Sequence, residues 1–97
     1  MGREYRKLIA WQKADELVMK IYAKTGSFPR EEVYGLTSQL RRAALSVPTN
    51  IAEGMAKRSE KDKAHFLVLA EASLSEVGYL LDVAGRLGYL SQQDTLQ

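Results

Sequence analysis

Apolar residues recur every three or four positions along most of the chain, and no segment alternates convincingly between apolar and polar residues. This spacing is typical of α-helices that bury one face. Glycine and polar residues separate three such stretches, which predicts helices at about 9–25, 37–57 and 60–87. A capping pattern at Ser91-Gln92-Gln93-Asp94 predicts the start of a fourth helix near residue 92. We therefore expect one all-α domain over residues 1–97, with its fourth helix truncated or missing in this chain.

Local signals mark the expected helix ends. Gly26 is a natural stop for the first helix, and Thr37 is a reasonable N-cap for the second. Ser59 with Asp62 three residues later forms a capping box that begins the third helix. Gly88 is expected to end it.

The expected second helix has an unusual composition in its last turns. Pro48 has no N–H to donate to the carbonyl of Ala44, which costs about 3 kcal/mol in a plain helix, so the assembled protein must favour a bend there. At about 100° per residue, one flank of this helix carries a polar line of Arg42, Ser46, Asn50 and Glu53. We interpret Pro48, Asn50, Glu53 and Gly54 as a structural motif for helix packing and assembly. Glu53 is expected to pair with a basic residue or to cap freed backbone; the alternative is a functional carboxylate with a perturbed pKa.

The expected third helix carries two apolar strips. One strip suits the core of the domain. A second strip lies about 120° or more away on the helix and consists of Val68, Ala72, Tyr79 and Val83. Exposed strips of this length are typical of interfaces, so we expect self-association through these residues.

The positions of the charged residues are more informative than the net charge of the chain. Fourteen basic residues against twelve acidic residues leave a net charge of +2, which is too small to imply nucleic-acid binding by itself. Four cations fall within seven residues and are opposed by Glu60 and Asp62: Lys57, Arg58, Lys61 and Lys63. Repeated around an oligomer, such patches would attract a polyanion, and the helix start beside them would hold a phosphate. A solvated turn is the alternative.

Enzyme chemistry is not visible in the sequence. There is no cysteine and only one histidine, His65, so no metal-ligand set is expected. No serine stands in a recognisable nucleophile motif, and no glycine-rich loop is present to hold a cofactor phosphate, which predicts a non-enzymatic protein without cofactors. The N-terminus is polar and no apolar run approaches about 18 residues, so we expect a cytoplasmic protein without a membrane segment.

Several motifs together resemble a known family. They are Trp11-Gln12-Lys13-Ala14, Phe28-Pro29 with Glu32-x-Tyr34-Gly35-Leu36, Gln39-Leu40-Arg41-Arg42-Ala43, Asn50-Ile51-Ala52-Glu53-Gly54 and Leu87-Gly88-Tyr89-Leu90. In this order they closely resemble the bacterial four-helix-bundle proteins, which are also called the 23S rRNA intervening-sequence or S23-type ribosomal protein family. The resemblance covers the chain from about Tyr5 to Leu90.

The resemblance implies an antiparallel up-down four-helix bundle that assembles into a homopentamer. A related branch is the accessory variability protein of diversity-generating retroelements, which binds nucleic acid and a reverse transcriptase. By position, the Asn50 to Gly54 motif would be a bundle and subunit-contact element, and Arg41, Arg42, Lys57 and Arg58 would contribute basic surface. Members of the family continue into a long fourth helix, of which this chain has only Ser91 to Gln97.

Two functional hypotheses follow. The first is an oligomeric accessory protein that binds RNA or DNA, with a reverse transcriptase or another ribonucleoprotein component as a further partner. Its candidate contact residues are Arg41, Arg42, Lys57, Arg58, Lys61 and Lys63. The second is a scaffold for protein partners without a nucleic-acid role. Trp11, Tyr22 and Tyr79 would stack on bases under the first hypothesis, or serve as core or interface residues.

Overall fold

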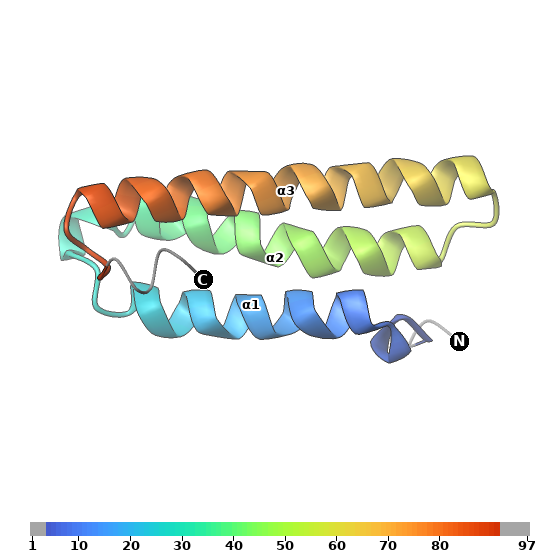
Figure 1. The fold of residues 1–97 in the computed structure, drawn as a ribbon, viewed down its shortest axis with the longest axis horizontal. Coiled ribbons are helices and arrows are strands. Elements are labelled where there is room, and N and C mark those ends of the chain that lie inside the picture. The colour runs from blue at the N-terminus through green and yellow to red at the C-terminus, as the bar shows by residue number, and fades with distance from the viewer. Residues whose placement is uncertain (1–3, 92–97) are drawn as a thin grey trace.

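The computed structural model describes residues 4–91, and these residues are predominantly helical (Figure 1). The long helices are α1 (Ile9–Thr25), α2 (Leu36–Met55) and α3 (Glu60–Arg86). Two short 3₁₀ segments, η1 (Glu4–Lys7) and η2 (Arg30–Glu32), precede α1 and α2. Consecutive helices run in opposite directions, so the expected all-α, up-down arrangement is confirmed. The fourth helix expected near residue 92 lies outside the described residues.

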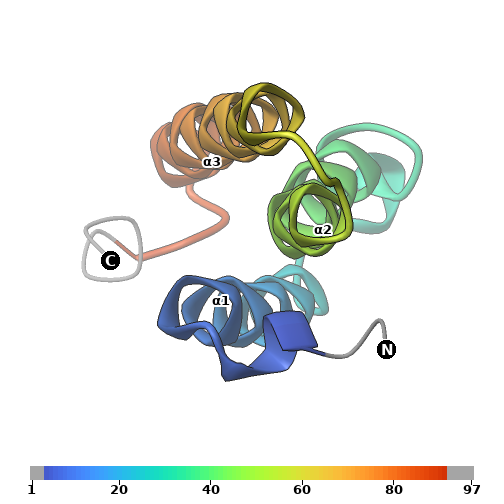
Figure 2. The ribbon, with the colours of Figure 1, turned by 90° about the vertical axis from the view of Figure 1, so that its right-hand side faces the viewer.

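The helix α2 lies between the other two. It packs against both α1 and α3, whereas α1 and α3 do not approach each other closely within residues 4–91. Viewed along the helices, the three elements form an open arrangement with α2 at its apex (Figure 2). Leu40 and Ala44 of α2 are completely buried at the centre of the packing. Their small and medium-sized side chains allow close contact with both neighbours.

An apolar groove of about 450 Å³ runs along the open side between α1 and α3. Ala14 and Leu17 line it from α1, and Val47 and Ile51 of α2 also contribute to its lining. Leu67 and Leu74 line the α3 side and are each half exposed. The apolar face of α3 is therefore only partly covered by α1 and α2.

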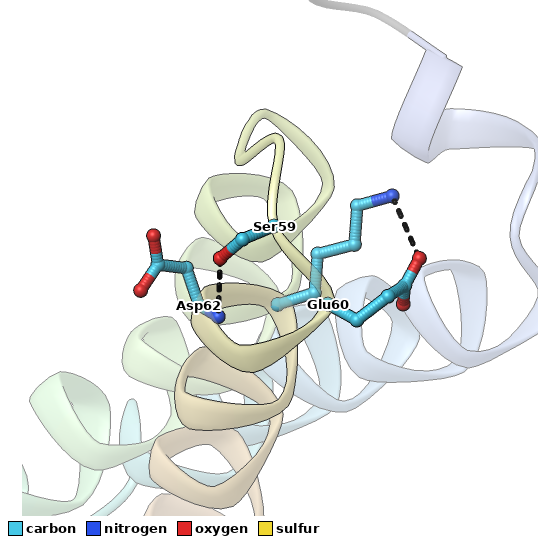
Figure 3. A network of polar contacts seen from close by, with 4 residues as sticks. Ser59, Glu60 and Asp62 are labelled. Carbon is cyan, nitrogen blue, oxygen red and sulfur yellow. Dashed lines mark hydrogen bonds and ion pairs between the residues drawn. The ribbon is translucent and has the colours of Figure 1, made fainter.

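The ends of α3 are fixed by local hydrogen bonds. The Ser59 hydroxyl accepts a hydrogen bond from the backbone N–H of Asp62 at 3.0 Å, as the capping pattern predicts (Figure 3). At the other end, Gly88 adopts a left-handed backbone with φ of 82°. The N–H of Tyr89 reaches the carbonyl of Ala84 and that of Gly88 reaches Gly85, which is the Schellman pattern. By contrast, Gly26 at the end of α1 is right-handed, with φ of −61°, so it is not the left-handed stop that glycine usually provides.

The start of α2 differs from the expectation. The helix begins at Leu36, and Thr37 is a buried residue inside it and not the N-cap. The cap comes from Glu32, whose carboxylate accepts a hydrogen bond from the N–H of Leu36 at 3.1 Å. The other oxygen of this carboxylate accepts one from the Tyr89 hydroxyl at 2.9 Å. Glu32 therefore joins the start of α2 to the segment that follows α3.

Only some residues of the polar line on α2 take part in contacts with another helix. The Asn50 amide donates to the carbonyl and hydroxyl oxygens of Ser46, at 2.8 and 2.9 Å. The Ser46 hydroxyl also accepts from that of Ser73 on α3, at 2.8 Å, so these three residues form one network between α2 and α3. Arg42 and Glu53 are exposed, and Glu53 shows neither an ion pair nor a backbone cap within residues 4–91.

Two other members of the motif are packing residues. Pro48 is buried, and α2 continues through it from Leu36 to Met55. Gly54 is buried against α3, where a Cβ at this position would lie only 3.0 Å from the Cβ of Phe66. The bend predicted at Pro48 stays a prediction.

The tight contact at Gly54 predicts a position-specific effect of a larger side chain. We expect Gly54→Leu to destabilise the fold by about 1–3 kcal/mol, because the new side chain must displace Phe66. Gly78 is the matched control, since it also lies inside a helix but nothing comes within 4 Å of a Cβ added there. Gly78→Leu should stabilise by about 0.8 kcal/mol through helix propensity. Urea unfolding measures the change in the free energy of unfolding for both variants. Equal changes would contradict the packing role of Gly54.

The contact between Tyr89 and Glu32 predicts a loss of stability in alkali. The hydrogen bond to Glu32, followed by burial, raises the pKa of the Tyr89 phenol from its usual 10.0. Because the folded pKa is the higher one, this contribution to stability is complete below about pH 10 and is lost as the pH rises through the folded pKa. Between about pH 8 and pH 12, the midpoint temperature of thermal unfolding should fall more steeply for the wild type than for Tyr89→Phe. Parallel profiles would show that the hydrogen bond does not form.

Candidate nucleic-acid interface

The six candidate basic residues lie at two separate places. Arg41 and Arg42 are in the second turn of α2, whereas the others surround the connection between α2 and α3, here called the basic turn: Lys57, Arg58, Lys61 and Lys63. At a rise of 1.5 Å per residue, residues 41 and 57 are about 24 Å apart along the helix axis. In Figure 1 the start of α2 and the basic turn lie at opposite ends of the molecule. One chain therefore does not bring all six cations together.

The basic turn offers exposed charge beside a helix start that is already partly capped. Ser59 already accepts from the Asp62 N–H, and the first turn of α3 contains two acidic residues (Figure 3). Lys63 forms an ion pair with one of them, Glu60, at 3.7 Å. The ammonium of Lys57 lies 5.0 Å from the centre of the Phe66 ring. The geometry therefore disfavours the phosphate site that the sequence suggested at this helix start, and leaves Lys57, Arg58 and Lys61 as exposed cations.

Arg41 is held in place by the last turns of α1. Its Nε donates to the Thr25 hydroxyl oxygen at 2.8 Å, and its Nη2 donates to the Tyr22 carbonyl at 3.4 Å. The guanidinium carbon also lies 4.5 Å from the centre of the Tyr22 ring, in range for a cation–π contact. Thr25 is itself buried and donates to the Ile21 carbonyl at 2.7 Å. Arg41 is therefore a half-buried arginine whose side-chain position is fixed by another helix.

A hollow of about 270 Å³ surrounds this arginine, here called the Arg41 pocket. Its lining combines arginine, hydroxyl and apolar side chains: Tyr22, Val33, Thr37, Ser38, Arg41, Arg42 and Leu45. None of these is acidic. The sequence predicts that Arg41 and Arg42 contribute basic surface. The pocket, however, depends on residues of α1 that no local pattern connects to α2.

The second strip of α3 is exposed over most of its length. Val68 and Tyr79 are 59% and 63% exposed, and Ala72 is exposed between them. Val83 differs, because it is partly buried against the core cluster that contains Phe28 and Leu36. The exposed part is here called the outer strip: Val68, Ala72 and Tyr79.

The other aromatic candidates have structural partners. Trp11 packs against the core cluster formed by Ala14, Val47, Ile51 and Ala70. It also makes an edge contact with Tyr5, with ring centres 5.1 Å apart. Tyr22 lies beneath the guanidinium of Arg41. Tyr79 is more exposed than either of them.

The described part of the chain shows neither a group of metal ligands nor a membrane-spanning helix. Within residues 4–91, no three or more His, Cys, Asp or Glu side chains are grouped so that they could hold a metal ion. His65 is exposed, and its ring lies beside that of Phe66, with centres 5.4 Å apart. None of the described helices is both long and apolar enough to cross a bilayer.

Comparison with known proteins places these features in a family. A search of curated proteins finds no match to the chain. Residues 6–97 match the family described as 23S rRNA-intervening sequence protein. This match includes α1, α2 and α3, the Arg41 pocket and the basic turn. Because it covers nearly the whole sequence, the chain belongs to the 23S rRNA-intervening sequence protein family.

Proposed function

We propose that this protein is a non-enzymatic, cytoplasmic accessory protein that binds RNA or DNA through basic patches repeated around a homo-oligomer. The observation that carries the proposal is the basic turn, where Lys57, Arg58 and Lys61 are exposed together at one end of the molecule. The family description adds an association with a 23S rRNA intervening sequence. Phosphate contacts supply most of the affinity of non-specific nucleic-acid binding, and exposed lysine and arginine side chains make such contacts.

Oligomerisation is part of the proposal, because one chain has a net charge of only +2. A ring would repeat the basic turn and so strengthen the field that a polyanion meets. The outer strip supports self-association, because Val68 and Tyr79 expose apolar surface on the side of α3 away from its core contacts. The family resemblance makes a homopentamer the expected assembly.

The second candidate function is a protein-interaction scaffold. The outer strip favours it too, since an exposed tyrosine flanked by aliphatic residues suits a protein interface. Its partner would be a reverse transcriptase or another ribonucleoprotein component. Under this proposal, binding changes little with salt concentration, whereas nucleic-acid binding weakens steeply.

Charge removal at the basic turn should weaken RNA binding more than the same removal elsewhere. We expect the triple variant Lys57→Gln, Arg58→Gln, Lys61→Gln to bind a single-stranded RNA more weakly. The slope of log K against log salt concentration should also become less steep by about 0.7 for each lost phosphate contact. Fluorescence anisotropy from 25 to about 200 mM salt measures both quantities.

The control removes the same charge from other exposed positions, through Lys13→Gln, Lys20→Gln and Arg86→Gln. An equal loss in both variants would show that net charge, and not the basic turn, controls binding. If the wild type bound neither RNA nor DNA at low salt, the nucleic-acid proposal would be withdrawn in favour of the scaffold.

A charge in the outer strip should weaken the assembly. We expect Tyr79→Glu to shift the protein to a smaller mass, because burial of an unpaired carboxylate in a subunit contact is unfavourable. Glu76→Lys is the control, since this exposed position of α3 already carries a charge. Light scattering after size exclusion gives the masses. A wild type that is monomeric at micromolar concentration would contradict the oligomer.

A further inference from the structure

We propose that the Arg41 pocket binds a single phosphate group. The inference rests on the nucleic-acid proposal only for the source of that phosphate, which would then be the backbone of the bound strand. The pocket differs from the basic turn, because the pocket contains a fixed arginine whereas the turn contains exposed cations. The inference therefore concerns recognition of one phosphate, beyond a general attraction of polyanions.

The side chain of Arg41 is preorganised. Thr25 and the Tyr22 carbonyl accept from Nε and Nη2, so the guanidinium is already oriented in the free protein. The remaining donors are those of Nη1 and the second N–H of Nη2, and no described residue accepts from them. Two N–H groups at this end of an arginine match two oxygens of a phosphate. Because the side chain is already ordered, binding loses less conformational entropy than at a flexible cation.

The positive charge of the pocket is not balanced by a nearby carboxylate. Arg41 is half buried, yet it forms no ion pair with any described residue, and no carboxylate lines the pocket. Arg42 adds a second cation to the same lining. Partial burial also reduces the solvent screening of these charges. The pocket is therefore electropositive and would be stabilised by an anion.

The pocket lining also contains a residue with a buried hydroxyl group. Thr37 is only 7% exposed, and its Oγ has no hydrogen-bond partner within the described part of the chain. A buried polar atom without a partner is unfavourable for the free protein. Thr37 and Ser38 both line the pocket beside the two arginines, and the covered Thr37 hydroxyl would donate to a phosphate oxygen once it turned toward the hollow.

The size of the hollow limits the ligand. At about 270 Å³ it falls below the range of about 300–1,000 Å³ that is typical of sites for drug-sized molecules. It therefore suits one phosphate with part of a sugar, and not a complete nucleotide. Val33 and Leu45 are nearly half exposed in the lining and offer apolar contact to that sugar.

A charge-conserving substitution tests the pocket. Arg41→Lys keeps the positive charge but removes the paired donors, and we expect it to weaken single-stranded RNA binding about tenfold. Arg86→Lys is the matched control, because this exposed arginine lies outside both the Arg41 pocket and the basic turn, and the change should alter the affinity less than twofold. Equal effects of the two substitutions would overturn the pocket and leave the nucleic-acid proposal standing. Circular dichroism establishes that both variants are folded.

A second measurement uses the wild-type protein and needs no variant. The Nε–H signal of Arg41, assigned in a ¹⁵N spectrum, should shift on titration with inorganic phosphate, with a nucleoside monophosphate and with a short RNA. A shift with phosphate and nucleotide, but no binding of RNA or DNA, would support the pocket and overturn the proposed function. No shift with any of the three would overturn the pocket. A larger shift with a glutamate-rich peptide than with phosphate would show that the ligand class is wrong.

Discussion

Close packing of α2 against both neighbouring helices is the constraint on which the rest of the fold depends. α1 and α3 do not approach each other, so each is held in place chiefly through α2. This requires small or fully buried side chains along α2, which Ala43, Ala44 and Gly54 provide. It also explains the place of Pro48, which is buried in the same helix and so contributes apolar surface where a surface proline would only weaken the helix.

Polar contacts add what the apolar contacts cannot provide, which is a fixed relation between particular residues. Glu32 joins the start of α2 to Tyr89, and Arg41 joins α2 to the end of α1. The Ser46, Asn50 and Ser73 network joins the middle of α2 to α3. Hydrogen bonds depend strongly on distance and angle, so these three links restrict sliding of one helix along another more than interchangeable aliphatic contacts do.

Local patterns predicted the helices well because their causes are local. The apolar period, the Ser59 cap and the Gly88 stop each depend on residues within one or two turns, and the observed helix bounds lie within two residues of the expected ones. The start of α2 was misplaced because its cap is the side chain of Glu32, supported by Tyr89 from 57 residues away. Likewise, Arg41 was recognised as basic, but its fixed position depends on Thr25, which is 16 residues distant. No spacing in the sequence reveals either tertiary contact.

The backbones of α1 and α3 do not come close to each other, which has a mechanical consequence. Two helices that are joined mainly through a third are held firmly at each contact and less firmly in the angle between them. The contacts of Arg41 with α1, and the packing of Phe28 against Tyr89, restrain that angle at one end of the molecule. At the other end, the first turns of α3 are exposed on most sides. The angle between α1 and α3 is therefore least restrained beside Leu67 in the apolar groove, at the end of the molecule away from Arg41.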